Sequence, residues 1–422
     1  MHVVLFFTLS ICVGTVCAMR TLPAVQIAHC VSALQPAHSH AARSFRLGTA
    51  TQKFSGSIHH RVPNLHLRSA RPVAVAAGDP VRAAIVGGGL AGLAAAIALR
   101  TVGVDAHVYE RTTELRGTAG TGLTLWPNGL SALSAIDSTL VTEIEQVGSP
   151  TTLIEVTTAD GATKLPNPTG DPRRFPQTYG QPMLNIRWAH LQRILASRVP
   201  EDRLHLGHTF DGIEMADPGA EMRVSVRFKS TETQSPLPPA YVDFVVGADG
   251  INSAMRGLLV GDGAPRDAGR TIWRAIIPLD TTLLPRGACT MSAGAGKVGF
   301  LTHIGGEDLY WSAFATDEAI EQSGLDRADF ADVKAYLLEQ FADVYRVREC
   351  IARTPAHDIL ERRVADRQPL VDANGVAAIP WGRERDAAHA HAHAQTQADA
   401  DADAGAAGAE GVGGEGAVGG GG

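Results

Sequence analysis

The feature that most constrains the fold is a glycine-rich turn between an apolar segment and an alanine-rich one. Residues 81–86 are short and mostly apolar, as in a strand buried on both faces of a parallel sheet. They run into Gly87-Gly88-Gly89-Leu90-Ala91-Gly92, which has the spacing G-x-G-x-x-G. Residues 90–102 predict a helix that Gly103 ends, and residues 104–110 predict a second strand. This order predicts a Rossmann-type dinucleotide-binding unit.

Each glycine of the motif has its own physical reason. Gly87 permits the tight turn, Gly89 lets the backbone approach a pyrophosphate, and Gly92 lets the helix pack close to the strand. The helix N-terminus offers N–H groups and a positive dipole end to phosphates. Glu110 ends the second strand, 18 residues past Gly92, and can accept hydrogen bonds from ribose hydroxyls. The spacing alone leaves open whether the dinucleotide is FAD or NAD.

A second motif bears on that choice. Residues 241–246 predict a strand, which ends in Gly247-Ala248-Asp249-Gly250-Ile251-Asn252-Ser253-Ala254-Met255-Arg256. With both motifs, the sequence resembles the class A flavoprotein monooxygenases, the family of aromatic hydroxylases and zeaxanthin epoxidases, which pairs the glycine motif with G-A-D-G-x-x-S-x-x-R. The resemblance implies FAD as cofactor and NAD(P)H as co-substrate. From the residues alone, an Asp-Gly turn that caps a helix at Asn252 or Ser253 is the alternative.

Further segments resemble the same family. They are the loop and Pro-Asn turn at 120–128, the R-x-x-L-x-x-x-L helix at 187–195, and the D-R-x-P segment at 364–369. The resemblance implies that Arg111 lies beside the adenosine and that Arg187 reaches the cofactor. The cofactor-binding residues predicted in this way are Gly87, Gly89, Leu90, Ala91, Gly92, Glu110, Arg111, Arg187, Asp249, Gly250, Arg256 and Asp386.

The remaining pattern predicts the material of a second domain. The predicted strands are 151–160, 223–229, 271–278, 288–292, 298–303 and 308–315, and the predicted helices are 327–339 and 341–350. Short connections between the later strands favour antiparallel pairing. The predicted fold class is therefore α/β, a Rossmann-type FAD-binding domain with a parallel sheet, interleaved with an antiparallel-sheet substrate domain. Aromatic residues on these strands, which belong either to the core or to a substrate cavity, are Trp273, Phe300, Tyr310, Trp311 and Phe314.

The domain organisation follows from these segments. We expect a disordered targeting leader over 1–78, and an FAD-binding domain over 79–267 in which 150–182 contributes to the substrate domain. The substrate domain covers 268–354, and 355–385 returns to the FAD domain. The low-complexity tail 386–422 contains almost no side chain that could be buried, so we expect it to be disordered.

The chemistry implied by the resemblance belongs to the cofactor. The enzyme would use NAD(P)H and O2 to hydroxylate or epoxidise a small apolar aromatic or isoprenoid substrate. We therefore expect no universal catalytic base among the side chains and no metal ion. The sequence has no Ser-His-Asp order, and we interpret the scattered histidines as core or surface residues; they are His107, His190, His205, His208, His303 and His357.

Charge and hydropathy limit the partners. The net charge of −7 argues against a nucleic-acid-binding surface. No apolar run reaches 18 uninterrupted residues, so no integral membrane span is predicted. The substrate, the choice of NADH or NADPH, and the oligomeric state stay open.

The sequence departs from the family near its C-terminal motif. The family has W-G-x-G-R, then a strand, then G-D-A-A-H, whereas this chain reads Trp381-Gly382-Arg383-Glu384-Arg385-Asp386-Ala387-Ala388-His389. The intervening strand is missing, which is expected of a C-terminally truncated relative. Asp386 corresponds to the family residue that binds the flavin ribityl chain. A non-catalytic or degenerate FAD- or nucleotide-binding relic is therefore the alternative function.

The first 78 residues indicate a targeting segment. They contain seven Lys and Arg, seven His and no Asp or Glu, a composition typical of a transit peptide. We expect a plastid (chloroplast) location. Residues 3–18 also have the apolar character of a secretory signal, so the secretory pathway, or a complex plastid reached through a bipartite leader, is the alternative.

Overall fold

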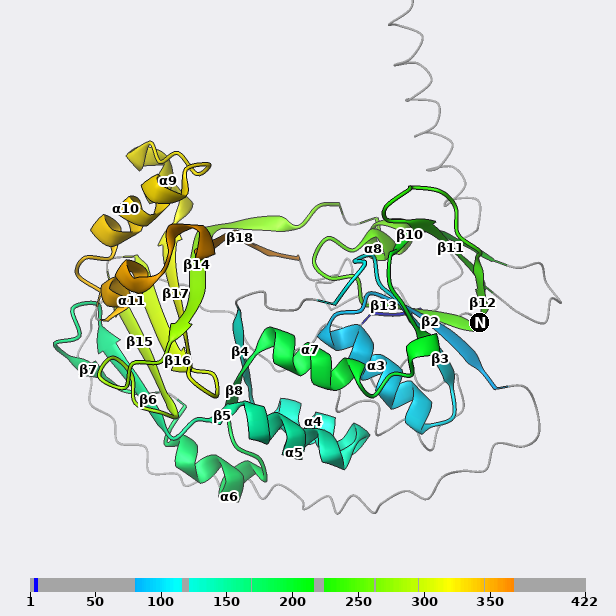
Figure 1. Cartoon of the computed structure of the whole chain (residues 1–422), viewed down its shortest axis with the longest axis horizontal. Helices are drawn as coiled ribbons and strands as arrows, with labels where there is room; N and C mark the ends of the chain where they lie inside the picture. Colours follow the sequence, from blue (N-terminus) through cyan, green and yellow to red (C-terminus); the bar gives the residue numbers. More distant parts are fainter. Residues whose placement is uncertain are drawn as a thin grey trace, which may run out of the picture. The chain divides into compact units, whose positions relative to one another are not determined.

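The computed structural model describes residues 4–6, 80–115, 121–167, 169–215, 224–261, 263–294, 296–344 and 346–367 (Figure 1). The leader predicted for 1–78, apart from residues 4–6, lies outside the described residues, as does the predicted tail with Asp386. The described chain has the predicted α/β class, because one sheet is wholly parallel and another is mainly antiparallel.

The parallel sheet follows from the first apolar segment. Its strands are β1 (Val4–Phe6), β2 (Arg82–Val86), β3 (Asp105–Tyr109), β9 (Leu204–His205) and β13 (Phe244–Gly247). Their order is β1-β13-β2-β3-β9, and each neighbouring pair is parallel. Residues 83–85 of β2 are fully buried, as expected of a strand covered on both faces. The helix predicted for 90–102 is α3 (Leu90–Thr101), which connects β2 to β3.

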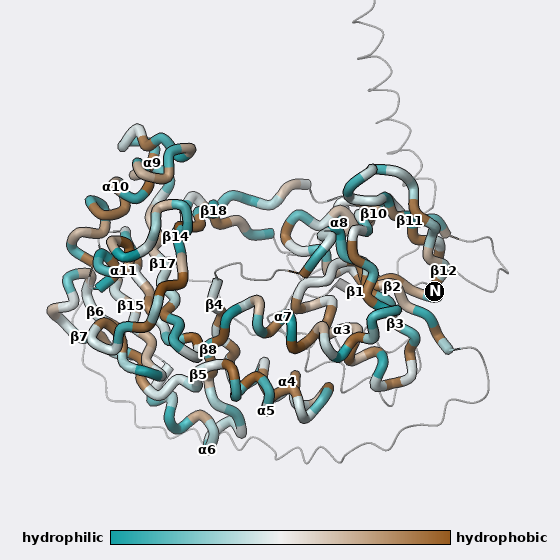
Figure 2. Tube along the Cα trace, viewed as in Figure 1, coloured by the Kyte–Doolittle hydropathy of each residue, from teal (hydrophilic) through white to brown (hydrophobic). Residues whose placement is uncertain are grey.

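Further helices share a core with this sheet. They are α4 (Pro127–Ile136), α5 (Ser138–Val147) and α7 (Trp188–Ala196). The Asp137 carboxylate accepts a hydrogen bond from the Thr139 N–H and so caps α5. Brown and teal segments alternate along α4 and α5 in Figure 2, as in helices with one buried face.

Short elements complete this part of the chain. A small antiparallel sheet has the order β4 (Gly122–Leu125), β8 (Leu184–Arg187) and β5 (Ser149–Pro150). The remaining short helices are η3 (Pro172–Arg174), α6 (Phe175–Tyr179), η4 (Glu201–Arg203) and α8 (Ala254–Leu259).

The single strand predicted for 241–246 is wrong, because two strands occupy this segment. β12 (Ala240–Val242) pairs in a three-stranded antiparallel sheet with β11 (Val224–Ser230) and β10 (His208–Met215), whereas β13 joins the parallel sheet. The break falls at Asp243, whose N–H donates to the Arg82 carbonyl at 3.0 Å and whose Oδ2 accepts from the Arg82 N–H at 2.9 Å. These two bonds satisfy the start of β2 while the chain passes between the sheets.

The largest sheet has seven strands in the order β18-β14-β17-β16-β15-β6-β7. Their bounds are β18 (Leu360–Asp366), β14 (Arg266–Pro278), β17 (Asp308–Thr316), β16 (Lys297–His303), β15 (Ala288–Gly294), β6 (Leu153–Thr158) and β7 (Lys164–Leu165). Neighbours are antiparallel except β15 and β6, which are parallel. Strands from residues 153–165 are therefore built into a sheet whose other strands begin at residue 266.

One face of this sheet carries a helical layer. Trp273 and Trp311 are fully buried in a core shared with α9 (Asp317–Ser323), α10 (Phe330–Gln340) and α11 (Val347–Arg353), and η5 (Ala356–Asp358) precedes β18. The helix predicted for 341–350 is wrong in its start, since α11 begins at Val347. Phe341 is fully buried after the end of α10, and the Val344 N–H donates to its carbonyl in a turn.

Candidate cofactor site

The glycine-rich turn between β2 and α3 is closed by backbone contacts. Gly87 has a φ of +113°, and a Cβ there would lie 2.3 Å from the Ala248 carbonyl oxygen. A Cβ at Gly92 would lie 1.9 Å from the Gly87 carbonyl oxygen. Both positions therefore require glycine, Gly87 for its conformation and for space, Gly92 for space alone.

Gly89, the third glycine of the turn, faces open space. A Cβ at this position would meet no atom within 4 Å, and its φ of −72° is available to any residue. Gly89 is the N-cap of α3 and has no side chain that could accept from the first N–H groups of the helix. The first turn, which includes Leu90 and Ala91, contains no acidic residue. The first N–H groups of α3 thus face this opening with the positive end of the helix dipole, an arrangement that fits a pyrophosphate.

The Glu110 carboxylate lies against the same turn. Its Oε2 accepts from the Gly88 N–H at 2.6 Å and its Oε1 from the Thr112 N–H at 3.0 Å. A Cβ at Gly88 would lie 2.8 Å from the Glu110 Cβ, so the close approach needs glycine here too. The neighbouring Arg111 is exposed, and its carbonyl accepts from the Thr231 hydroxyl at 2.5 Å. These bonds fix a carboxylate beside the opening, where it can meet ribose hydroxyls.

The second motif lies beside the first. The Ala248 N–H donates to the Val86 carbonyl at 2.8 Å, which joins the end of β13 to the end of β2. Gly250 has a φ of +86°, and a Cβ there would meet no atom within 4 Å. The structure thus brings a second open glycine to the edge of the sheet that carries the first motif.

The start of α8 uses two side chains of this motif. The Asp249 Oδ2 accepts from the Met255 N–H at 3.1 Å, and the Ser253 hydroxyl accepts from the Arg256 N–H at 2.8 Å. Helix capping, the alternative interpretation of this motif, therefore applies at Ser253. Arg256 is half-buried on α8.

One residue of the site escaped the sequence analysis. Gln192 on α7 is 4% exposed and donates from Nε2 to the Gly88 carbonyl at 2.9 Å, so it braces the glycine turn from behind. A polar residue between Leu191 and Ile194 on the buried face of an amphipathic helix is the signal that could have found it.

Arg187 ends β8 and is the N-cap residue of α7. Its Nε and Nη2 donate to the Asp308 Oδ2 at 3.1 and 2.7 Å. The guanidinium thus pairs with a carboxylate on β17, and the contact of Arg187 with the cofactor, which the resemblance implies, stays a prediction. β4 is also close to β17, since a Cβ at Gly122 would lie 2.9 Å from the Tyr310 Cγ.

Three histidines that are far apart in the sequence lie together in the structure. The His107 Nδ1 and the His205 Nε2 are 2.9 Å apart, and Tyr109 stacks on His205 with 4.6 Å between ring centroids. His208 lies 5.6 Å from both His205 and Tyr109 by the same measure. Pairing of β3 with β9 brings these residues together over about 100 residues of sequence, which no local pattern reveals.

Burial governs the electrostatics of this cluster. Loss of solvent, followed by the charge of His107, lowers the pKa of His205 to about 4. Loss of solvent also lowers the pKa of His107, and Asp105 opposes that shift. Within the described part of the chain, no group of three or more His, Cys, Asp or Glu is arranged to hold a metal ion.

The aromatic residues on the large sheet lie on both of its faces. Trp273 and Trp311 belong to the core under the helices. Phe300 and Phe314 are half-buried on the opposite face, as the strand register requires, and Tyr310, 7% exposed, shares that face. Loss of solvent raises the pKa of Tyr310.

Comparison with known proteins bears on the cofactor. Residues 80–271 match the FAD binding domain family. Over 199 residues the chain is 36% identical to the 3-amino-4-hydroxybenzoate 2-monooxygenase of Streptomyces cremeus, a match that covers 47% of this chain and 46% of that protein. It is 27% identical over 314 residues to the aurachin C monooxygenase/isomerase of Stigmatella aurantiaca, which covers 72% of this chain and 73% of that protein. The chain thus spans less than half of the Streptomyces relative.

Solved structures share the fold. The Klebsiella pneumoniae protein HpxO, crystallised with FAD and uric acid, aligns with a TM-score of 0.58 and 23% identity over 70% of this chain and 72% of that one. A protein described as a FAD-containing monooxygenase from Photorhabdus luminescens aligns with a TM-score of 0.55 and 16% identity, covering 69% of this chain and 78% of that one.

Proposed function

We propose that this chain is an FAD-dependent monooxygenase that uses NAD(P)H and O2. The premise is that residues 80–271, which match the FAD binding domain family, form an FAD-binding domain of the kind found in class A flavoprotein monooxygenases. The observation that carries the proposal is the opening at Gly89. The N-terminus of α3 faces this opening, the first turn of the helix contains no acidic residue, and the Glu110 carboxylate lies beside the same glycine turn. The comparisons support the cofactor, and they support the reaction only through relatives that this chain matches over part of their length.

Different residues of the site would bind different parts of FAD. The first turn of α3, with Leu90 and Ala91, would bind the pyrophosphate, and Glu110 would bind the adenosine ribose. Asp249 and Gly250 would face the cofactor from the second motif. When bound, FAD supplies the redox chemistry that activates and transfers oxygen. The protein itself would bind FAD and the substrate, orient the substrate and exclude water from the site.

The face of the large sheet opposite its helices supports the proposed substrate class. Half-buried apolar side chains on that face include Ile272, Ile276, Phe300 and Phe314. These side chains suit a small aromatic or isoprenoid substrate, and the half-buried Arg274 lies on the same face between Ile272 and Ile276. In the described chain, no helix has both the length and the apolar character needed to cross a membrane.

The test uses the purified full chain. It should retain a yellow flavin and oxidise NADH or NADPH faster when a substrate is present, with phenols and zeaxanthin as trial compounds. Oxygenated product should form in step with NAD(P)H consumption. Failure to bind FAD at saturating concentration, or conversion of all reducing equivalents to hydrogen peroxide with every substrate, would contradict the proposal.

A second candidate function is a non-catalytic FAD- or nucleotide-binding protein. The departure from the family motif at residues 381–389 favours it, and those residues lie outside the described part of the chain. The rate of NAD(P)H oxidation distinguishes the two candidate functions. The non-catalytic protein would bind FAD or ADP but would not accelerate NAD(P)H oxidation with any trial substrate.

We also propose a plastid location, which the acid-free composition of residues 1–78 supports. A fusion of residues 1–78 to a fluorescent protein should enter plastids. The matched control replaces the six arginines and Lys53 by glutamine, which removes the positive charge and should leave the fusion in the cytosol. Diffuse fluorescence of the unaltered fusion would refute the targeting, and secretion would assign residues 3–18 as a signal peptide.

A further inference from the structure

β18, the last described strand, is fixed along its length to the large sheet. It pairs with β14 in antiparallel register, and the Arg266 Nε and Nη2 donate to the two Asp366 carboxylate oxygens at 2.8 and 2.6 Å. A bidentate pair of this kind fixes the relative orientation of the guanidinium and the carboxylate as well as the distance between them. The end of β18 therefore has a defined position relative to β14.

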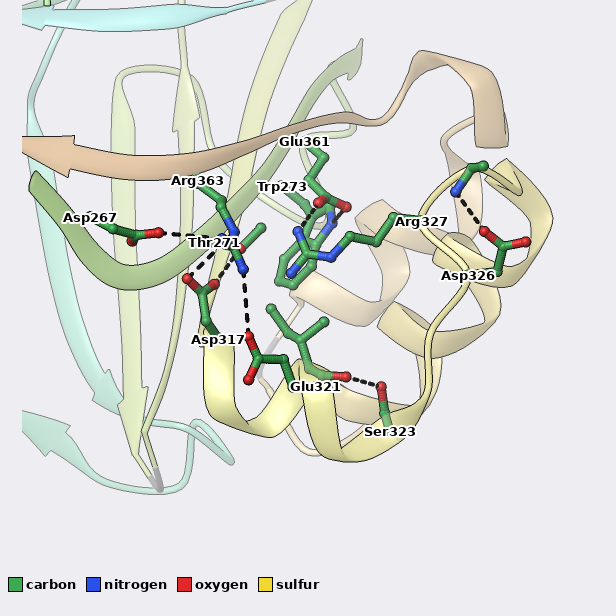
Figure 3. Close-up of polar contacts among 12 residues, drawn as sticks. Asp267, Thr271, Trp273, Asp317, Glu321, Ser323, Asp326, Arg327, Glu361 and Arg363 are labelled. Carbon is green, nitrogen blue, oxygen red and sulfur yellow. Dashed lines mark hydrogen bonds and ion pairs between the residues drawn. The ribbon is translucent and has the colours of Figure 1, made fainter. Parts of the chain in front are cut away.

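Side chains on β18 add a second set of anchors (Figure 3). The Glu361 Oε2 accepts from the Nε1 of the fully buried Trp273 at 2.8 Å, and the Glu361 Oε1 pairs with Arg327. Arg363 points toward a group of carboxylates, those of Asp267 at 3.4 Å, Asp317 at 3.8 Å and Glu321 at 3.6 Å. Three elements, β14, α9 and the loop that precedes α10, thus bind the same strand.

The residue that follows β18 contacts the second cofactor motif. The Arg367 Nε and Nη2 both donate to the Ile251 carbonyl, at 3.0 and 2.9 Å. Its Nη1 donates to the Gly263 carbonyl. Ile251 precedes α8 and Gly263 follows it, so one guanidinium holds the chain on both sides of this short helix.

The Asp249 carboxylate, which accepts from the Met255 N–H, holds the start of this turn, whereas the glycine at its centre has no side chain to hold it. Gly250 adopts a φ of +86° and has no side chain to pack. Glycine loses more conformational freedom on ordering than any other residue, so a turn built on it gains from an external anchor. The planar fork of arginine can bind two carbonyls at once, which a lysine ammonium cannot do in the same geometry.

We propose that Arg367 is a positioning residue for the cofactor turn, Asp249 to Ile251. By clamping the Ile251 and Gly263 carbonyls from the fixed end of β18, it sets the turn in the conformation that meets FAD. The inference rests on FAD binding by residues 80–271 and is independent of the proposed oxygenation.

The first test needs no cofactor. Amide hydrogen exchange is compared in the full-length wild type, Arg367→Met and Arg367→Lys. Arg362→Met is the matched control, because Arg362 is an exposed arginine of β18 whose side chain makes no hydrogen bond or ion pair with the described residues, although its backbone lies in the ladder with β14. We expect at least tenfold faster exchange at residues 249–256 in Arg367→Met, a smaller increase in Arg367→Lys, and none in Arg362→Met. Unchanged exchange at 249–256 in Arg367→Met would overturn the proposal.

The second test separates positioning from general destabilisation. FAD affinity of Arg367→Met should fall about tenfold or more, the equivalent of about 1.4 kcal/mol, with an unchanged unfolding midpoint of the apoprotein. Millimolar guanidinium should restore part of the affinity in Arg367→Met, whereas equimolar ammonium should not, since only guanidinium reproduces the fork. Equal effects of the two ions, or an equal loss of affinity in Arg362→Met, would overturn the proposal. A wild type that binds FAD but oxygenates nothing would refute the proposed function and leave this inference standing.

Discussion

Arg187 and Asp308 join two sheets through a single carboxylate oxygen. The Arg187 Nε and Nη2 approach the Asp308 Oδ2 at 3.1 and 2.7 Å, across 121 residues of sequence. The Arg187 side chain is 19% exposed and that of Asp308 is 30% exposed. Because solvent only partly screens this pair, it should contribute more to stability than an ordinary surface ion pair.

A double-mutant cycle with Arg187→Met and Asp308→Asn measures that contribution. We expect a coupling free energy of about 1–2 kcal/mol in urea unfolding. The control cycle uses Arg173 and Asp171, an ion pair in which the arginine is 71% exposed and which should couple by less than about 0.5 kcal/mol. Similar coupling in the two cycles would show that the Arg187 pair is not shielded from solvent.

Substitution of Gly89 tests the proposed pyrophosphate site. Gly89→Val should abolish FAD retention, because the side chain would fill the opening at the start of α3, yet the apoprotein should fold since no atom lies within 4 Å of the new Cβ. Gly129→Ala on α4 is the control, as its Cβ also meets no atom within 4 Å and its φ is not positive. Gly103 would serve poorly because its φ is +87°. Equal flavin content in Gly89→Val and wild type would refute the assignment.

Two substitutions of Glu110 separate the effect of its charge on FAD affinity from the effect of its hydrogen bonds. Glu110→Gln retains one acceptor for the Gly88 N–H or for a ribose hydroxyl, so FAD affinity should fall by about tenfold, and Glu110→Ala should lose more. Isothermal titration of the apoprotein with FAD and with ADP provides the measurement. A greater loss for FAD than for ADP would place Glu110 away from the adenosine half.

Acid should destabilise the fold through His205. Its pKa of about 4 in the folded state lies below the ordinary value of 6.5, so the unfolded chain binds more protons between these values. The contribution of His205 to stability is therefore intact above pH 6.5 and declines as the pH falls toward 4. With allowance for solvent screening, the loss should be about 1–2 kcal/mol.

The matched variant is His205→Phe, which keeps a ring against Tyr109 and removes the titration. Urea midpoints at pH 7.5 and 5 should differ less in His205→Phe than in wild type. His357→Phe, at a side chain that is 74% exposed, should behave as wild type. Parallel pH dependence of His205→Phe and wild type would show that other groups govern the acid sensitivity.

Local patterns predicted the parts of the fold that depend on neighbouring residues. The strand, glycine turn and helix over 81–102 depend on spacing within a few residues, and the α/β class followed from them. The strand predicted for 241–246 failed because pairing with two different sheets divides it at Asp243, and a run of apolar residues does not record its partners.

The candidate site shows the same contrast between local and distant contacts. The sequence predicted Glu110, whose carboxylate contacts Gly88 across 22 residues, but not the Gln192 contact with Gly88, which spans 104 residues. The pairing of Arg187 with Asp308 and the His107–His205 contact were likewise set by tertiary folding. Asp386 and the predicted domain limits stay predictions.

The place of β6 in the large sheet has a consequence for synthesis of the chain. β6 pairs in parallel with β15, as in the pair Leu153 and Ala288, and the intervening chain must leave the ribosome before that pair can form. Until then the nascent chain carries an unpaired strand edge, which is prone to aggregation. A fragment ending near residue 271 would keep this edge permanently, so the FAD-binding part cannot be excised by one cut. A soluble fragment would also need an internal deletion of residues 150–182, with the two flanking ends joined.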